Sequence, residues 1–402
     1  MRELTDWIDN YVKLTEETEP PLMFRLWTSI SVIAACLQRK CRLDWGSLTF
    51  YPNLYIVLVS PPGKARKGTA MKIGRRFLDE LSINVAAESI TREALVRELM
   101  ESNHTSVDPQ NRMITHSSLT VYSEELAVFL GQQNPQLVMD LTDWFDCSNK
   151  WIYRTKGSGI DEIIGVWVNL MGATTPDLLR STISGDAIGG GLTSRMIFVF
   201  EPRRGKVVPY PRWGDDEIAL QTKLVRDLER IRNLSGVFKT TESFIEEWTT
   251  WYTAQADNPP FEDPNFAGYV ERRPTHVMKL SMILNASRTS SMLLEAIDLR
   301  RAIKILEATE YRMPQALRGV GRNQNSDVLT RVWSEIAIKK ELTFRTLLAK
   351  YYQDADKRML TQIVETLESM GVVKVTVSGS NQKIIYIGED RRKQPTAEEA
   401  LK

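Results

Sequence analysis

Short hydrophobic runs alternate with polar segments along the first half of the chain, and this pattern predicts strands that alternate with helices. The run LYIVLVS at 54–60 is rich in Val and Ile and ends at Pro61-Pro62-Gly63, which is typical of a buried strand in a parallel sheet. Further short strands are predicted over 83–86, 118–123, 166–170 and 196–200, and helices over 6–14, 23–37, 68–81 and 92–102. Residues 45–210 are therefore expected to form an α/β core with a parallel sheet.

Two segments of this core follow other patterns. Residues 103–112 are polar and are expected to form a connector without regular structure. Residues 151–165 contain two short β-type runs around Gly157-Ser158-Gly159, and we expect a β-hairpin there. Thr91 is expected to cap the helix over 92–102, because its hydroxyl can accept a hydrogen bond from a free backbone N–H.

The second half of the chain changes to helices joined by polar segments. Residues 1–44 and 211–320 are expected to form a helical N-terminal segment and a helical lid subdomain, the latter with helices over 217–234, 242–257, 273–288 and 296–312. A polar linker over 319–326 precedes three predicted helices, over 327–339, 344–352 and 356–370, and the runs VVKVTV and KIIYI. That order predicts a winged-helix domain over 325–388 and a disordered tail over 389–402.

Composition limits the classes of function that the chain can have. Its 52 Lys and Arg residues balance 51 Asp and Glu residues, so a general cationic surface for nucleic acid is excluded and any such site must be a local patch. Three scattered cysteines are too few for a disulfide framework or a zinc ribbon. Because no apolar leader and no membrane-length run is present, we expect a soluble, cytoplasmic protein without a membrane partner.

The segment between the first buried strand and its helix, SPPGKARKGT at 60–69, has the context of a phosphate-binding loop. Backbone N–H groups at a helix N-terminus hold phosphates there, and a lysine neutralises their charge. We therefore predict a nucleotide site at Gly63, Lys64, Arg66, Lys67, Gly68 and Thr69.

This segment departs from the usual pattern G-x-x-x-x-G-K-[ST]. If Lys67 is the phosphate lysine, Arg66 replaces the glycine and Gly68 replaces the hydroxyl residue that binds Mg²⁺, with Thr69 one position late. Three interpretations stay open: the turn is rebuilt so that Thr69 reaches the metal, the site is degenerate, or the segment is only a basic strand-to-helix turn.

The strand SLTVYS at 118–123 leads directly into Glu124-Glu125. Carboxylates at the C-terminal edge of a parallel sheet lie beside the crevice where ligands bind. Either Glu124 binds Mg²⁺ and Glu125 polarises the attacking water, or Ser123 and Glu124 take these two roles. The alternative is that the two acids only favour the N-terminus of a helix through its dipole.

Two further segments supply residues for the same chemistry. The strand in VWVNLMGATTP brings Thr174, Thr175 or Asn169 to the same edge, where one of them can sense the γ-phosphate. Arg195, after Gly189-Gly190-Gly191, is predicted to reach the nucleotide of a neighbouring subunit as an arginine finger. An ion pair of Arg195 with Asp177 or Asp186 is the alternative.

The hairpin over 151–165 is a candidate DNA contact. Lys156 lies at its tip, with Arg154 and Tyr153 on one arm. A basic tip flanked by aromatic residues suits single-stranded phosphates and stacked bases, although lysines also serve to protect exposed strand edges.

The joint order of FYPNLYIVLVSPPGKARKGTA, VYSEELAVFLG, KWIYRTKGSG, VNLMGATTPDLL and GGGLTSRMIFVFE resembles the phage and prophage P-loop ATPases of the replicative helicase and primase-helicase kind. The resemblance covers most of residues 20–315. It implies a RecA/AAA-like ATPase core, ATP and Mg²⁺ as substrate and cofactor, and a ring, commonly a hexamer, that moves on single-stranded or forked DNA.

The hairpin also resembles the DNA-gripping hairpin of superfamily-three viral helicases, which implies that Lys156 contacts DNA. The segment 269–279 resembles a lid with a nucleotide-sensing arginine, either Arg272 or Arg273. No separate primase motif is present in the sequence.

Together these features predict an ATP-dependent DNA helicase or translocase of phage replication, with a winged helix that binds fork DNA or a replication partner. Two other functions stay open: a non-catalytic DNA-binding replication or regulatory protein with a degenerate nucleotide site, or an ATPase switch for helicase loading or recombination.

Overall fold

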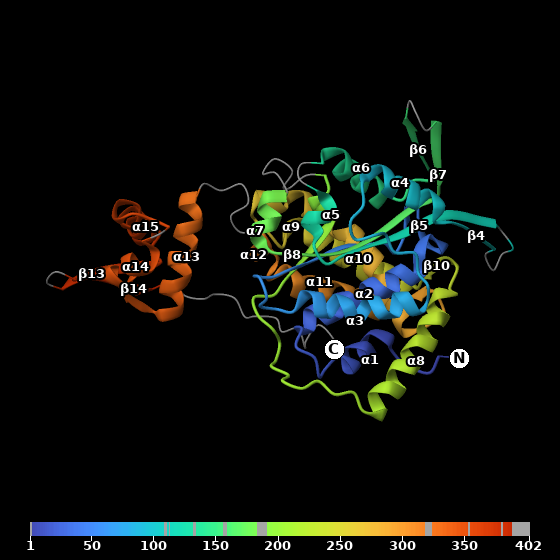
Figure 1. Ribbon diagram of the computed structural model, residues 1–402, viewed down its shortest axis with the longest axis horizontal. Coiled ribbons are helices and arrows are strands. Elements are labelled where there is room, and N and C mark those ends of the chain that lie inside the picture. Colours follow the sequence, from blue (N-terminus) through green and yellow to red (C-terminus); the bar gives the residue numbers. More distant parts are fainter. Residues whose placement is uncertain are drawn as a thin grey trace. The chain divides into compact units, whose positions relative to one another are not determined.

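The chain forms two compact units, residues 1–317 and 318–394, each of which is described separately (Figure 1). The computed structural model describes residues 2–107, 111, 113–131, 134–155, 159–182, 191–317, 324–352, 354–378 and 381–387. Across these ranges, no helix combines the length and the apolar character needed to cross a membrane.

A five-stranded sheet forms the centre of the first unit. Its strands are β4 (Asn103–Val107), β5 (Met113–Ser123), β8 (Val166–Thr174), β3 (Tyr55–Val59) and β9 (Met196–Phe200), in that spatial order. β5, β8, β3 and β9 run parallel, and β4 pairs antiparallel with β5. The predicted α/β core is therefore confirmed. The segment 103–112, predicted as a connector, instead begins with strand β4.

The strand order creates a switch point at β3. The chain leaves β3 for β5 and β8 on one side and later returns to place β9 on the other side. In parallel sheets, ligands bind beside the carboxyl ends of the strands at such a point. The turn after Val59 therefore begins at the position in this sheet where a ligand is most expected. The predicted strand over 83–86 reduces to one parallel bridge, between Val85 and Thr120.

Helices cover both faces of this sheet (Figure 1). On one face lie α2 (Leu22–Leu37), in which 14 of 16 residues are buried, and α3 (Lys67–Glu80). On the other face lie α4 (Arg92–Glu101), α5 (Leu126–Leu130) and α6 (Pro135–Phe145). The Thr91 hydroxyl accepts a hydrogen bond from the Ala94 N–H, which confirms the predicted cap of α4.

A second sheet joins residues 41–50, at the boundary predicted between the N-terminal segment and the core, to two of the joints between the helices predicted for residues 211–320. Strands β1 (Cys41–Trp45) and β2 (Leu48–Phe50) pair with each other, and β1 also pairs in parallel with β10 (Gly236–Thr240), which pairs with β11 (Leu293–Leu294). The predicted boundary at residue 44 falls inside β1. Strands of two to five residues have too little periodicity to be recognised, and their partners lie far away in the sequence.

Further helices complete the first unit. They are α1 (Trp7–Leu14), α7 (Pro176–Thr182), α8 (Asp215–Arg232), α9 (Glu242–Asp257), α10 (Ala267–Arg288), α11 (Ala296–Glu310) and α12 (Met313–Ala316). The predicted hairpin is also present, as the antiparallel strands β6 (Lys150–Thr155) and β7 (Gly159–Ile164). Its base precedes Val166, so the hairpin begins at the amino edge of the sheet, opposite the turn after β3.

The second unit contains the three helices and the hairpin that the sequence predicted. They are α13 (Gln324–Lys339), α14 (Phe344–Tyr351), α15 (Lys357–Ser369), β13 (Val373–Ser378) and β14 (Asn381–Tyr386). An additional short strand, β12 (Glu341–Thr343), pairs with β14 to complete an antiparallel sheet. The core contains Val332, Ile336, Leu347, Leu360, Leu367 and Ile384. The predicted tail, 389–402, lies outside the described residues.

Candidate nucleotide site

The turn between β3 and α3 has an unusual backbone. Gly63 and Arg66 both have positive φ, of 67° and 56°. A non-glycine residue pays a conformational penalty in this region and keeps it only where its surroundings hold it there. The Arg66 side chain is held by Glu19, with Nε to Oε2 at 2.6 Å. Arg66 thus adopts a conformation that glycine, the residue of the usual motif at this position, would adopt without penalty.

Lys67 is the first residue of α3 and its amino group turns back over the start of the turn. Nζ donates to the carbonyl oxygen of Ser60 at 3.0 Å and to Ser60 Oγ at 2.9 Å. Burial lowers the pKa of Lys67, and the negative charge of Glu125 opposes that effect. The amino group therefore lies at the mouth of the turn on two neutral oxygens, which phosphate oxygens can replace with stronger, charge-assisted bonds.

Glu124 lies against the start of α3. A Cβ atom built on Gly68 would stand 2.9 Å from Glu124 Oε2, and Lys72 Nζ is 3.7 Å from the same oxygen. Burial raises the pKa of Glu124, while Lys72 opposes this effect. The residue type at position 68 therefore decides whether the carboxylate can occupy this place. Lys72, one turn into α3, was not singled out by the sequence.

Glu125 follows as the N-cap of α5 and is exposed. Its charge acts on Lys67, so the two acids and the lysine of the turn share one edge of the sheet. Ser123, the alternative metal ligand, is buried as the last residue of β5. The two predicted pairs are Glu124 with Glu125 and Ser123 with Glu124. Only in the first pair are both side chains accessible.

Thr174 ends β8 beside the turn. It pairs in register with Val59, and the Ser60 N–H lies 3.4 Å from its carbonyl oxygen. Asn169 lies inside the same strand, where its side chain accepts from the Leu54 N–H at 3.0 Å, so its amide supports the sheet. Thr175 immediately precedes α7, and its hydroxyl accepts from the Leu178 N–H. Thr174 is thus the polar residue of this strand nearest the turn.

The other predicted residues of the turn are accessible. Gly63, Lys64 and Thr69 are exposed, and Thr69 is the third residue of α3. In the described part of the chain, no group of three or more His, Cys, Asp or Glu side chains could hold a metal. A Mg²⁺ ion here would therefore depend on one or two protein ligands together with phosphates and water, which is its usual mode beside nucleotides.

Arg195 lies at the opposite edge of the sheet. It precedes Met196, which pairs in register with Tyr55 at the start of β3. The turn follows Val59 at the other end of β3, so the five residues of this strand, about 16 Å of extended chain, lie between Arg195 and the turn. Its guanidinium pairs with Asp146, Nη2 to Oδ2 at 2.6 Å, and not with the predicted Asp177. The second predicted partner, Asp186, lies outside the described residues, as do Gly189 and Gly190.

Arg273 is enclosed in the helical part. Its Nε and Nη2 donate to the two carboxylate oxygens of Glu310 at 2.7 and 2.9 Å, and both residues are buried. This pair satisfies both charges between α10 and α11, so packing accounts for the position of Arg273. Arg272, the other predicted sensor, is partly exposed and lies 3.4 Å from Asp146.

The hairpin β6–β7 has two different faces. Trp151 stacks on Tyr153 and contacts Trp144, and the Arg92 guanidinium lies over the Tyr153 ring. The aromatic residues therefore fix the hairpin to α4 and α6, and base stacking by Tyr153 stays a prediction. Arg154 is exposed on the other face. Lys156, at the predicted tip, lies outside the described residues.

One buried arginine, which the sequence did not indicate, holds both ends of this hairpin. Arg39 Nη1 donates to the carbonyl oxygens of Cys147 and Val166, and Nη2 donates to Asn149 Oδ1 at 2.6 Å. Its guanidinium also lies 4.2 Å from the centre of the Tyr51 ring. Only tertiary contacts identify this residue, because the acceptors of its side-chain hydrogen bonds lie more than a hundred positions along the chain.

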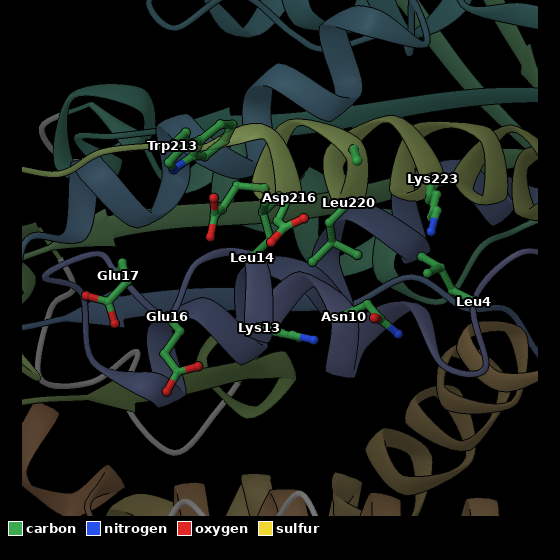
Figure 2. Close-up of a pocket in the computed structure, with 12 residues that line it drawn as sticks. Leu4, Asn10, Lys13, Leu14, Glu16, Glu17, Trp213, Asp216, Leu220 and Lys223 are labelled. Carbon is green, nitrogen blue, oxygen red and sulfur yellow. The ribbon is translucent and has the colours of Figure 1, made fainter.

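A hollow of about 500 Å³ lies elsewhere, between α1 and α8. Figure 2 shows Lys223 and Asn10 toward one end of it, and Trp213 and Glu17 toward the other. None of the residues of the β3–α3 turn line this hollow. It is therefore separate from the candidate nucleotide site.

No protein-family model matches the chain, and no curated protein matches its sequence. The function is therefore argued from the geometry of the site.

Proposed function

We propose that this protein is an ATP-dependent DNA helicase or translocase with a RecA/AAA-like P-loop core. The observation that carries the proposal is the convergence at the switch point of the sheet. The Lys67 turn leaves β3 there, and the carboxylate of Glu124, from the end of β5, lies against the start of the helix that follows the turn. Phosphoryl transfer to water requires groups that bind the phosphates and acids that hold the metal and activate the water. The lysine, the N–H groups at the start of the helix and the two acids lie at one edge of the sheet and can supply them.

The strand order supports the same class. β8 lies between β3, which carries the turn, and β5, which carries the acids. The turn and the acids therefore follow the carboxyl ends of parallel strands that lie one strand apart, at the edge where ligands bind in such sheets. The strand order also brings Thr174 beside the turn, where its hydroxyl can contact the terminal phosphate.

Each side chain has a stated role in this proposal. Lys67 leaves Ser60 and binds β- and γ-phosphate oxygens, while the N–H groups at the start of α3 bind the same phosphates. Glu125 accepts a proton from the attacking water, and Thr174 contacts the γ-phosphate. Glu124, with Thr69, would hold Mg²⁺, which neutralises charge on the β- and γ-phosphates when bound.

The opposite edge of the sheet supports action between copies. Arg195 lies about 16 Å along the strands from the turn of its own chain, too far to reach its own nucleotide. In a ring, of which a hexamer is the expected form, Arg195 would reach the nucleotide of the neighbouring copy. The hairpin β6–β7 begins at this same edge, so Arg154 and Lys156 would contact DNA close to the interface between copies.

The second unit would bind duplex or fork DNA, or a replication partner, as a winged helix. Its helices and three-stranded sheet have the element order of that fold. Arg358 of α15 and Lys374 of β13 are exposed cations that can contact phosphates. Replacing both by Glu should weaken binding to forked DNA without changing ATP hydrolysis in the absence of DNA.

The decisive experiment is steady-state ATP hydrolysis, with and without single-stranded DNA, together with strand separation on a forked substrate. We expect DNA-stimulated hydrolysis that falls at least about a hundredfold in Lys67→Ala. Lys239→Ala, an exposed lysine on β10, is the matched control and should behave as the wild type. Hydrolysis without strand separation would instead favour a switch that loads another helicase.

A second candidate is a DNA-binding regulator that holds nucleotide without hydrolysing it. The observation that favours it is Gly68, which gives the site no hydroxyl at the position that usually binds the metal. This candidate predicts nucleotide binding that depends on Lys67 but no turnover under any DNA condition.

A further inference from the structure

Three cationic side chains gather around one carboxylate at the amino edge of the sheet. Arg195 and Arg272 reach Asp146 from different elements, at 2.6 Å and 3.4 Å. Lys279 lies about two helical turns after Arg272 along α10, and it is buried with its Nζ hydrogen-bonded to Asn53 Oδ1. His276, packed among them, is neutral, because burial lowers its pKa to about 3. The cluster therefore carries more positive than negative charge.

Arg195 is incompletely satisfied within this cluster. The residue is 8% exposed, its Nη2 binds Asp146 and its Nη1 donates to the Gly191 carbonyl oxygen at 2.9 Å. Its Nε is buried and has no hydrogen-bond partner in the described part of the chain. A buried donor of a charged group that lacks a partner is costly, and an anion with several acceptor oxygens can pair with the guanidinium more completely than one carboxylate.

The cluster is accessible at Asp146. The Asp146 side chain is 52% exposed and that of Arg272 is 31% exposed, whereas Arg195 and Lys279 lie behind them. An anion that approaches from outside would meet Asp146 first and would compete with it for both arginines. This geometry distinguishes the cluster from a closed pair such as Arg273–Glu310, in which both partners are buried.

We propose that Arg195 and Arg272 form one site for the terminal phosphate of a nucleotide bound to a second copy of this chain, and that Asp146 holds both arginines until that copy docks. The inference rests on the proposed function, since it uses the nucleotide of the Lys67 turn. It adds Arg272 as a second phosphate contact and Asp146 as an internal competitor. When the phosphate binds, it replaces the Asp146 carboxylate as the partner of the two arginines. The phosphate carries more charge and more acceptor oxygens than the carboxylate, and no covalent bond forms or breaks.

A second copy is the required source because the turn of the same chain lies at the other end of the strands. The register of β3 and β9 places Arg195 beside the amino end of β3, while Lys67 follows its carboxyl end. A nucleotide in the turn of one copy can therefore contact Arg195 and Arg272 only of another copy. In an unassembled chain both arginines stay on Asp146, so turnover should depend steeply on protein concentration.

The first test uses mixed subunits. Arg272→Ala should lower ATP turnover about a hundredfold and leave the nucleotide affinity of the dilute, unassembled chain unchanged. Mixing Arg272→Ala with Lys67→Ala should restore part of the turnover, because one variant supplies an intact turn and the other supplies intact arginines. Arg300→Ala, an exposed arginine of α11, is the matched control. Absence of rescue would overturn the inference.

The second test addresses Asp146. Asp146→Asn frees the two arginines, and we expect the protein concentration that gives half-maximal turnover to fall about fivefold or more. Nucleotide-dependent assembly, followed by sedimentation, should shift in the same direction and gives a readout that does not depend on activity. Asp146→Glu keeps the charge and should resemble the wild type. A merely structural ion pair predicts lower turnover and no gain in assembly for Asp146→Asn.

Failure of this inference differs from failure of the proposed function. If the wild type hydrolyses ATP but Arg272→Ala is indistinguishable from it, only the inference fails. If the wild type hydrolyses no ATP at any protein concentration, the proposed function fails and the inference falls with it. Should Asp146→Asn fail to fold, the mixed-subunit result decides, because Arg272 is partly exposed and its truncation leaves the core intact.

Discussion

The carboxylate of Glu124 and a side chain at position 68 exclude each other. Gly68 lies where the usual motif has Ser or Thr, and a Cβ there would stand 2.9 Å from Glu124 Oε2. Because the colliding atom is the end of a flexible side chain, a larger residue would displace the carboxylate and not the backbone. The glycine that makes the motif look degenerate is therefore the residue that admits the acid.

Substitution of Gly68 should separate stability from activity. In Gly68→Ala the helix gains up to about 1 kcal/mol of intrinsic propensity, while Glu124 must leave its place. We expect an unchanged or raised Tm and a reduced ATP turnover. Gly68→Ser displaces Glu124 equally but supplies a hydroxyl, so its turnover should exceed that of Gly68→Ala. Wild-type turnover in Gly68→Ala would show that the observed position of Glu124 is not the working one.

The two acids should differ in what they contribute. Glu124→Gln should raise the Mg²⁺ concentration needed for half-maximal turnover, because Glu124 is the carboxylate against the start of α3. Glu125→Gln should bind ATP and Mg²⁺ normally and lose about 10²–10⁴-fold in turnover, the usual contribution of a general base. Magnesium titrations of turnover and of nucleotide affinity measure both effects. A loss of turnover in Glu124→Gln, with Glu125→Gln unaffected, would instead assign the two roles to Ser123 and Glu124.

Arg39 should control the stiffness of the hairpin base. Arg39→Ala leaves three acceptors around residues 147–166 without their charged donor, so we expect a loss of about 3 kcal/mol in unfolding free energy. Backbone amides of β6 and β7 should exchange hydrogen faster. Arg42→Ala, which removes a partly exposed pair with Asp44, is the control and should change stability by less than about 1 kcal/mol. Unchanged exchange in β6 would contradict the role given to Arg39.

Arg273 should behave as a packing residue. Arg273→Met leaves Glu310 as an uncompensated buried charge, which typically costs about 3–5 kcal/mol. Removing both charges in Arg273→Met/Glu310→Met should cost much less, and urea unfolding of the single and double variants measures the difference. The double variant should keep wild-type nucleotide affinity. A loss of affinity in the folded double variant would instead support the nucleotide-sensing role predicted from the sequence.

Lys279 should give the first unit a distinctive alkaline dependence. Burial lowers the pKa of Lys279 from 10.5 to about 8, although Asp146 and Cys147 oppose the shift and Arg195 and Arg272 add to it. Between these two pKa values the unfolded chain binds more protons than the folded chain, so unfolding free energy rises with pH.

The comparison with Lys279→Met isolates this effect, because the other titrating groups are common to both proteins. From pH 7 to pH 10, the unfolding free energy of the wild type should rise relative to the variant by on the order of 2 kcal/mol. Urea unfolding at the two pH values measures the difference. A constant difference between the proteins would mean that Lys279 titrates normally when folded.

Features encoded by neighbouring residues could be predicted from the sequence. The periodicity over 242–257 gave α9 with the observed bounds, and the apolar run after Asn53 gave β3. The alternation of such elements was enough for an α/β core and for the turn at 60–69. These signals are local, because helix and strand periodicity develops within ten or so residues.

Features that depend on distant partners could not be predicted. Asp146 lies 49 positions from Arg195 and was not among its expected partners. The contact between Glu124 and Gly68 follows from how β5 packs beside α3, and the sequence alone suggested only that Gly68 was a defect. The packing of the aromatic residues of β6 against α4 and α6 likewise depends on tertiary contacts and could not be predicted.

The pairing of β1 with β10 has a consequence for synthesis on the ribosome. Strand β10 ends at Thr240, 199 residues after Cys41 begins β1, which corresponds to roughly 10–40 s of translation. During this interval α2, nearly all of whose surface is finally covered, emerges without most of the helices that enclose it. A nascent chain of this protein should therefore be a client of chaperones that shield apolar segments, and mutations that weaken the late-made strand should reduce yield before they reduce activity.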